Sequence, residues 1–599
     1  MSALAAVWTI AVAISGGFVL EWNSVRLLAS RSPRNPAVAA LIVWAAWWAL
    51  ATSAERSRWR LKLWSAVRRT LPIGLAGTLP AQLIPLLGAA TAIAIVALGI
   101  VKGAPYAGGS DAYGYVSQAH LWATGGTLRV EQPFVREITW PFVAEAVTPL
   151  GYRPVDNGLA IVPVYSPGLP MLMGAFERLE GRDAVFYVVP LLGGLAVWAT
   201  YLMGARLVQP AVGALAAALV ATSPTFLFHL LVPMSDVPVT AWWALTLALL
   251  LYDGRAAALG AGLACGAAIL TRPNLVPLAM LSGVALMWPA REGRRGPVVQ
   301  RTLLFAVGVI SACAVVMRIN QQLWGSAFAT GYEPLHILYS WDNLLPNLER
   351  YPRWLVETET PIVLLAAFAP WLVTQRRANG IATTAARAVT IVWLCFIGVV
   401  FLSYVFHHPN DGWFWLRYLL PAFPPLLVLT SVALNEMFAD LERGLGVIAL
   451  TLIVSVLSWH GVAYSRSTGM FTVREGERKS KAVGEHIAAS LPDRAVFISK
   501  LHSGSIRYYS GRFTVRYDWI PPRALDFVVD DLLRLNYRPY IVLEASEEMD
   551  FRELFEGART LIALDRAPMV LLDNAAKVRI YDPLNVQPGG DGGSSVVIR

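Results

Sequence analysis

The chain has 599 residues, of which 56% are hydrophobic and 15% charged, a composition that excludes an ordinary soluble protein and predicts a polytopic α-helical membrane protein. The formal net charge of +9 is explained by basic loops beside membrane spans, so it requires no nucleic-acid partner. All three cysteines, Cys265, Cys313 and Cys395, fall within apolar stretches, which excludes a disulfide framework and a zinc site built on cysteine.

Uncharged runs suited to crossing about 30 Å of hydrocarbon recur up to about residue 464. We count thirteen candidate spans, centred near residues 12, 44, 91, 194, 220, 245, 263, 281, 310, 367, 397, 427 and 454. The first span lacks a basic n-region and a small-residue cleavage site, so we expect it to be retained rather than removed as a signal peptide.

Arginine placement predicts the orientation, because cytoplasmic loops beside spans carry an excess of Lys and Arg. The segment between the second and third spans holds six basic residues and one acid, Glu55, and is expected to be cytoplasmic. Alternation then puts the N-terminus and the arginines near 291–301 and 376–387 inside, and it puts the 81-residue loop 102–182 and everything after residue 465 outside. Only Arg26, Arg31 and Arg34 run against this scheme.

The predicted topology gathers polar residues from four turns on the outer face. Asp111 follows two glycines at the start of the loop 102–182, Asp236 lies between the fifth and sixth spans, and Arg272 and Asn274 lie in the next outer turn. Another outer turn carries further polar and aromatic residues, namely His407, His408, Asp411, Trp413, Trp415, Arg417 and Tyr418. Ionisable groups at membrane depth usually face a cavity or a partner, so we expect an outward-facing cleft.

Each of these residues also has a structural interpretation. Asp111 and Asp236 are each followed by an expected helix, for which aspartate is a favoured N-cap. Arg272 and Arg417 suit snorkelling to the interface, and the histidines and aromatic residues suit an interfacial belt. The common outer location of all these groups favours a functional site.

Several motifs in sequence order resemble those of the GT-C superfamily of membrane glycosyltransferases. They are Gly108-Gly109-Ser110-Asp111-Ala112-Tyr113-Gly114-Tyr115 with Gln118-Ala119 and Gly125-Gly126, Tyr165-Ser166-Pro167-Gly168-Leu169-Pro170, Ser235-Asp236, and Arg417-Tyr418-Leu419-Leu420-Pro421. The resemblance covers about residues 81–465 and is strongest to the protein mannosyltransferase-like and aminoarabinose transferase-like bacterial branches.

This resemblance implies transfer of a sugar from a polyprenyl-phosphate carrier to a glycan, lipid or protein acceptor on the outer face of the cytoplasmic membrane. Asp111 matches the acid of the first outer loop and is expected to be the general base, and Asp236 matches the second acid. Arg417 and Arg272 are expected to bind the leaving phosphate, because a guanidinium binds phosphate oxygens bidentately. Further expected substrate-binding residues are His407, His408, Tyr418, Tyr113 and Tyr165, and the Trp- and Tyr-rich loop 321–360 is a candidate wall for the prenyl chain.

Protein mannosyltransferases usually have adjacent Asp and Glu in the first loop, whereas Ser110 and Ala112 flank Asp111 here, which weakens the case for a protein acceptor. No acid cluster suited to magnesium or manganese is evident. We therefore expect a metal-independent, inverting transfer without a cofactor.

Four regions are expected along the chain. Residues 1–80 hold two spans and a basic loop, 81–465 the transferase-like core, 466–585 a small extracytoplasmic α/β domain, and 586–599 a disordered tail. In the third region, helical patterns at 475–490 and 522–535 alternate with strands at 495–499, 540–543 and 578–581. No Gly-x-Gly-x-x-Gly follows these strands, so a Rossmann-like cofactor site is not expected.

Two other classes of protein fit many spans with buried charges. A transporter or flippase for a lipid-linked or anionic substrate is the main alternative, although such proteins often contain two repeated halves and no repeat is evident here. A non-catalytic membrane scaffold is the third interpretation.

Overall fold

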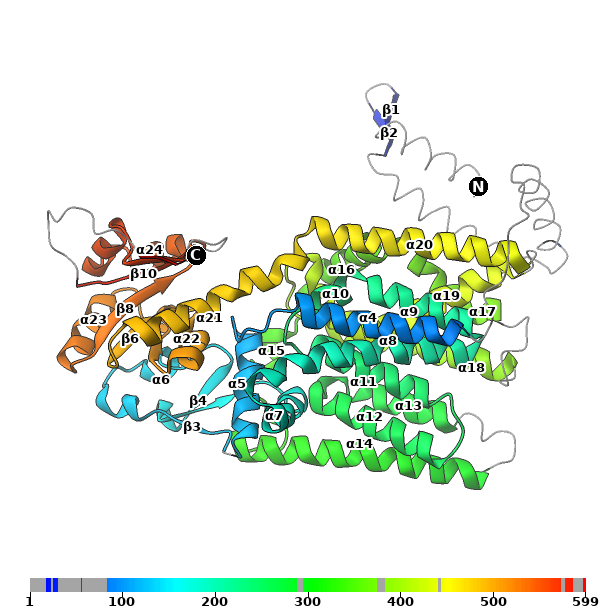
Figure 1. The fold of residues 1–599 in the computed structure, drawn as a ribbon, viewed down its shortest axis with the longest axis horizontal. Helices are drawn as coiled ribbons and strands as arrows, with labels where there is room; N and C mark the ends of the chain where they lie inside the picture. The colour runs from blue at the N-terminus through cyan, green and yellow to red at the C-terminus, as the bar shows by residue number, and fades with distance from the viewer. Residues whose placement is uncertain are drawn as a thin grey trace.

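The computed structural model describes residues 18–22, 25–30, 55, 83–125, 127–287, 295–373, 383–439, 443–572, 577–584 and 596–598. A body of long helices forms one part of the molecule, and a sheet-containing C-terminal region lies at one end of it (Figure 1). The short strands β1 (Phe18–Trp22) and β2 (Val25–Ser30) pair antiparallel. The centres of the first two expected spans, near residues 12 and 44, lie outside the described residues.

The helical body is built from apolar segments that follow one another between residues 84 and 467. It consists of α4 (Ile84–Lys102), α8 (Val188–Leu207), α9 (Pro210–Thr222), α10 (Pro224–Leu230), α11 (Asp236–Leu249), α12 (Arg255–Thr271), α13 (Pro277–Met287), α14 (Arg295–Trp324), α15 (Leu335–Leu338), α16 (Leu344–Glu359), η7 (Pro361–Phe368), α17 (Ala369–Leu372), α18 (Thr383–Val405), η9 (Trp413–Ala422), α19 (Phe423–Phe438) and α20 (Arg443–Ser467).

The structure contains fewer full-length spans than the thirteen expected from the sequence. Within the described residues, six helices are long and apolar enough to cross a membrane, or up to eight if each of two bent helix pairs is one span. Three further expected centres, near residues 245, 263 and 281, fall in the shorter apolar helices α11, α12 and α13, and the two near 12 and 44 lie outside the described residues. The 14 residues of α11 extend about 21 Å, less than the ~30 Å of hydrocarbon.

The segment between α4 and α8, called the loop segment below, lies at the same end of the helical body as the C-terminal region (Figure 1). It contains α5 (Asp111–Ala123), α6 (Val143–Ala146), α7 (Gly168–Glu180), η3 (Arg182–Tyr187) and the antiparallel strands β3 (Val130–Glu131), β4 (Tyr152–Val155) and β5 (Ala160–Pro163), in the order β3-β5-β4.

The C-terminal region contains a six-stranded sheet in the order β11-β9-β10-β8-β6-β7. Its elements are α21 (Val473–Ser490), β6 (Ala495–Ile498), α22 (Ser503–Ser510), β7 (Phe513–Val515), α23 (Leu525–Arg534), β8 (Arg538–Leu543), α24 (Glu548–Leu554), β9 (Val570–Leu572), β10 (Val578–Tyr581) and β11 (Val596–Ile598). Strands β7, β6 and β8 are parallel, and the α/β pattern expected from the sequence is observed. Of the tail expected to be disordered, the structure describes only Val596–Ile598, and these β-branched residues pair with β9.

The loop segment and the C-terminal region share a hydrophobic core. Successive side chains of a strand point to opposite faces, so Val496 and Ile498 of β6 pack in one cluster and Ala495 and Phe497 in another. The first cluster also contains six buried residues of the loop segment: Phe134, Val135, Ile138, Trp140, Ala146 and Val147.

Polar contacts reinforce this shared core. The Trp140 indole donates to Asp531 Oδ2 at 2.8 Å. The buried Arg507 guanidinium donates to Gln132 Oε1 at 2.9 Å and to the Val147 carbonyl. Burial lowers the pKa of Arg507 to about 10, so the side chain stays charged at neutral pH. The two parts therefore form one unit.

Removing the Trp140 hydrogen bond is expected to loosen this unit. Trp140→Phe keeps a large apolar ring but leaves the buried Asp531 carboxylate without this donor, which should cost about 1.5–3 kcal/mol. We expect a lower unfolding temperature in detergent and faster proteolysis of the C-terminal region. Trp519→Phe is the matched control, since Trp519 is 42% exposed in the same region. Equal unfolding temperatures for the two variants would contradict the shared core.

Candidate active site

Asp111 lies where a glycine turn enters helix α5. Gly109 has φ +55°, a left-handed conformation that glycine adopts without strain. The helix begins at Asp111, and its N-cap is Ser110. The Asp111 carboxylate accepts a hydrogen bond from Tyr165 Oη at 2.7 Å and from Arg417 Nη2 at 2.8 Å. The Asp111 carboxylate therefore binds Tyr165 and Arg417 rather than capping α5, the structural alternative for this residue.

Asp236 occupies a similar place at the start of α11 but is deeper in the protein. Its side chain is fully buried, whereas that of Asp111 is 28% exposed. Asp236 Oδ1 pairs with Arg272 Nη2 and lies 3.4 Å from Arg417 Nε. The pair of acids thus consists of one carboxylate that solvent reaches and one that it does not.

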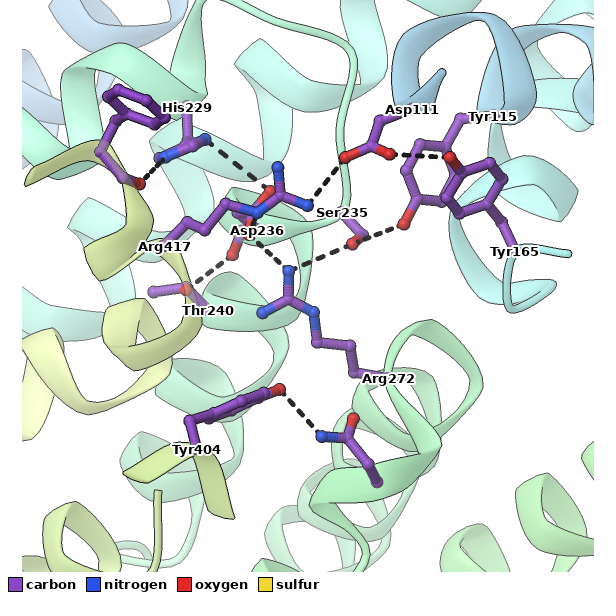
Figure 2. Close-up of polar contacts among 12 residues, drawn as sticks. Asp111, Tyr115, Tyr165, His229, Ser235, Asp236, Thr240, Arg272, Tyr404 and Arg417 are labelled. Atoms are coloured by element: carbon purple, nitrogen blue, oxygen red, sulfur yellow. Dashed lines mark hydrogen bonds and ion pairs between the residues drawn. The ribbon is translucent and has the colours of Figure 1, made fainter. Parts of the chain in front are cut away.

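Arg417 lies between the two acids and pairs with both (Figure 2). It comes from η9, which packs against α10 and α11. The guanidinium carbon lies 5.4 Å from the Trp415 ring centre and 5.6 Å from that of Tyr418, distances typical of cation–π contacts. Tyr418 in turn stacks on Tyr404 with ring centres 4.9 Å apart. We call Trp415, Tyr418 and Tyr404 the aromatic wall, and it holds Arg417 in place.

Arg272 ends α12 and approaches Asp236 from the opposite side to Arg417 (Figure 2). Its Nη2 also lies 3.5 Å from Ser235 Oγ. Its Nη1 is buried and donates to no described residue. A buried donor without a partner is costly, so a ligand that accepts a hydrogen bond from Arg272 Nη1 would remove this cost.

The other expected residues divide into those near the cluster and those away from it. Tyr165 contacts Asp111, and Tyr418 contacts Arg417. His407 packs on the aromatic wall, with its ring centre 4.9 Å from that of Tyr418. His408 is exposed, and its backbone N–H donates to the Leu338 carbonyl.

The structure places Tyr113, an expected substrate-binding residue, away from the charged cluster. Its ring packs on Tyr152 at 5.7 Å and against Gly504 of the C-terminal region. Asp111 and Tyr113 are two residues apart on α5, which puts them on nearly opposite faces, whereas residues four apart share a face. Tyr115, four residues after Asp111, is the tyrosine that helical spacing favours.

Three residues of the cluster were not singled out from the sequence as individual site residues. Tyr115 donates to Ser235 Oγ at 2.8 Å. His229, at the end of α10, is buried with Nδ1 3.8 Å from Asp236 Oδ2 and Nε2 3.0 Å from the Phe414 carbonyl. Helical spacing was a signal for Tyr115, but nothing local in the sequence marks His229.

Burial and charge set the protonation of the tyrosines beside Asp111. Burial, reinforced by the Asp111 charge, raises the pKa of Tyr165 well above its usual value. The same two causes raise the pKa of Tyr332 to about 12. Both phenols stay protonated at neutral pH, so Tyr165 acts as a hydrogen-bond donor to Asp111.

Arg301 and Arg387 lie toward the opposite ends of α14 and α18 from the charged cluster. Helix α18 carries Arg387 near its start and Tyr404 of the aromatic wall near its end, a separation of about 26 Å along the axis. Arg301 lies near the start of α14, and Gly331, shortly after its end, packs on Val164 beside Tyr165. These two arginines and the charged cluster therefore lie toward opposite ends of α14 and α18.

Comparison with known proteins gives one family match. Residues 139–252 match the family model of the oligosaccharyl transferase STT3, N-terminal. The matched segment includes Tyr165 and Asp236. No curated protein matches the chain.

Solved structures give distant likenesses. ArnT from Cupriavidus metallidurans bound to undecaprenyl phosphate is 14% identical, with 84% of this chain and 99% of that chain covered and a TM-score of 0.49. The archaeal oligosaccharyltransferase AglB from Archaeoglobus fulgidus, in complex with an inhibitory peptide and a dolichol-phosphate, is 11% identical, with 85% and 75% covered and a TM-score of 0.49.

The STT3 match covers only part of the chain, but it lies within the region that carries the sequence motifs. Over residues 139–252 this match agrees with the resemblance to membrane glycosyltransferases seen in the sequence motifs.

Proposed function

We propose that the protein transfers a sugar from a polyprenyl-phosphate carrier to an acceptor hydroxyl at the outer face of the cytoplasmic membrane. The observation that carries this proposal is the ion-paired cluster in which Arg417 joins a solvent-accessible carboxylate, Asp111, to a buried one, Asp236. The family resemblance supplies the reaction class, and the cluster supplies the groups that such a reaction needs.

Asp111 is the general base of the proposed reaction. A base must come within hydrogen-bond reach of the proton that it removes, and Asp111 is the more exposed of the two acids. The acceptor oxygen attacks the anomeric carbon while its proton passes to the Asp111 carboxylate. The bond from that carbon to the phosphate oxygen breaks on the opposite side, so the anomeric configuration inverts.

The two arginines stabilise the departing lipid phosphate. The electron pair of the broken bond stays on the phosphate oxygen, and cationic donors at that position lower the barrier. Arg417 is 17% exposed and Arg272 is 11% exposed. Arg272 Nη1 has no partner among the described residues, which makes it the strongest candidate donor to a phosphate oxygen.

Asp236 is a positioning residue in this scheme. It is fully buried and pairs with both guanidinium groups, so it fixes where their remaining donors point. This role differs from that of Asp111 because Asp236 acts through the arginines and does not touch the acceptor.

Asp111→Asn tests the base. The amide is nearly isosteric and still accepts a hydrogen bond from Tyr165, but it cannot take the acceptor proton. We expect the transfer rate, measured with membranes containing lipid-linked sugar, to fall about 10²–10⁴-fold at unchanged expression. Asp183→Asn is the control, because Asp183 is an exposed acid of the same segment. Normal transfer by Asp111→Asn would exclude this base, and a scaffold or transporter function would then be favoured.

Asp236→Asn tests the positioning role. Leaving Arg272 buried without its acid should destabilise the protein by about 3–5 kcal/mol, seen as a lower unfolding temperature. The double variant Asp236→Asn/Arg272→Met removes the unpaired charge and should recover much of the stability. Transfer should stay at least about tenfold below wild type in both variants. Wild-type transfer in the double variant would show that neither residue contributes.

Metal independence is tested with chelator. No described cluster of three or more His, Cys, Asp or Glu side chains is arranged to hold a metal ion, and we propose that the arginines supply the positive charge. Excess EDTA should therefore leave the transfer rate within about twofold of its starting value. Complete loss of activity that manganese restores would refute this part of the proposal.

A further inference from the structure

Two broken helices meet inside the helical body, away from the charged cluster. The chain bends by 62° between α9 and α10, at Ser223, and by 105° between α16 and η7, at Thr360. Thr360 has φ +66°, a strained conformation for a threonine that persists only where the surroundings impose it. Its hydroxyl is buried and has no partner among the described residues.

A cavity lies at this junction, and one carboxylate lines it. Its walls come from α9, α16, η7, α19 and α20, and the lining residues are Leu219, Thr222, Thr358, Glu359, Ile362, Val363, Leu427, Thr430, Leu457 and Gly461. Ser223 Oγ donates to Glu359 Oε1 at 2.6 Å. An ionisable residue within a membrane-spanning body is a candidate functional group by default.

The hydroxyl groups around the cavity donate their protons to protein acceptors. Thr222, Thr358 and Thr430 each donate to the carbonyl four residues earlier in their own helix, at 2.8, 3.0 and 2.9 Å. Ser223 has committed its proton to Glu359. The polar groups at the cavity therefore have lone pairs to offer, and they suit an occupant that is positively charged.

The backbone supplies carbonyl groups to the junction. Helices α9 and α16 end there, while α10 and η7 begin there, so the opposite charges of the helix ends offset one another and the C-terminal carbonyl oxygens remain as candidate ligands. Gly461 of α20 allows the close approach, since a side chain there would collide with the Thr222 carbonyl. His460 directs Nε2 to the Glu357 carbonyl at 3.1 Å. None of the lining residues is basic.

We propose that this cavity binds a monovalent cation of about the size of Na⁺, with the Glu359 carboxylate and hydroxyl oxygens of the junction as ligands. Sodium sites at unwound helices use backbone carbonyls and helix C-terminal ends in the same way. A single carboxylate balances one positive charge, whereas sites for divalent ions usually recruit more oxygen ligands and charge. The site is separate from the proposed transfer reaction.

Binding of ²²Na⁺ to the full-length protein in detergent tests the proposal without measuring transfer. We expect about one ion bound per chain, and an unfolding temperature a few degrees higher in NaCl than in choline chloride of equal ionic strength. Glu359→Gln should lose both effects. Glu436→Gln is the matched control and should keep both, because Glu436 is also buried in the helical body but lies in α19 away from the lining residues.

Thr430→Val is a second variant in case Glu359→Gln fails to fold. It is nearly isosteric and removes one oxygen from the cavity, so the affinity for ²²Na⁺ should fall at least about tenfold. Absence of binding to the wild type, wild-type binding by Glu359→Gln, or unchanged affinity in Thr430→Val would each overturn the proposal. An unfolding temperature that responds to pH through Glu359 but not to Na⁺ would show a proton site and would also overturn it.

Discussion

The ion pairing of Arg417 with two carboxylates is the interaction on which the candidate site depends. Charges removed from water are costly unless they are paired, and here two acids and two arginines compensate one another in a mostly buried position. The arginine comes from η9, whereas the acids begin α5 and α11. Three distant parts of the chain must therefore be packed correctly before any of these charges is stabilised.

The same pairing explains how the two carboxylates differ in role. Asp236 has no access to solvent and meets two guanidinium groups, while Asp111 meets one guanidinium and one phenol and remains partly exposed. Two residues of the same type thus have separate functions because of their surroundings. Figure 2 shows the arginines on either side of Asp236, with Asp111 toward the loop segment.

Much of the cluster could be expected from the sequence because the basic residues beside the apolar runs indicate which ends of the helices face the cytosol. The cationic segments expected in the cytosol left Asp111, Asp236, Arg272 and Arg417 to be expected at the opposite ends of the helices, and these four residues lie together in the structure. Tyr113 lies away from the cluster because it is two residues from Asp111 on α5 and so points to a nearly opposite face of the helix. His229 was missed, since a histidine in an apolar run gives no local signal, and it meets Asp236 only through tertiary packing.

The fold was predictable in its elements but less so in their lengths and contacts. Apolar runs indicated where helices lie, yet they could not show that α11 is short or that α9 and α16 bend. The strands of the C-terminal region were expected from short apolar runs that alternate with helical patterns. Their packing on Phe134 and Trp140 was not, because a core shared by distant segments has no signature in either one.

That shared core has a consequence for biogenesis. Trp140 and Asp531 are 391 positions apart in the chain, so the ribosome makes the loop long before its packing partner exists. Until the last strands emerge, the apolar side chains of the loop have nothing to cover them. The nascent protein must therefore tolerate or shield this surface throughout insertion, and a truncated product would carry it permanently as a target for quality-control proteases.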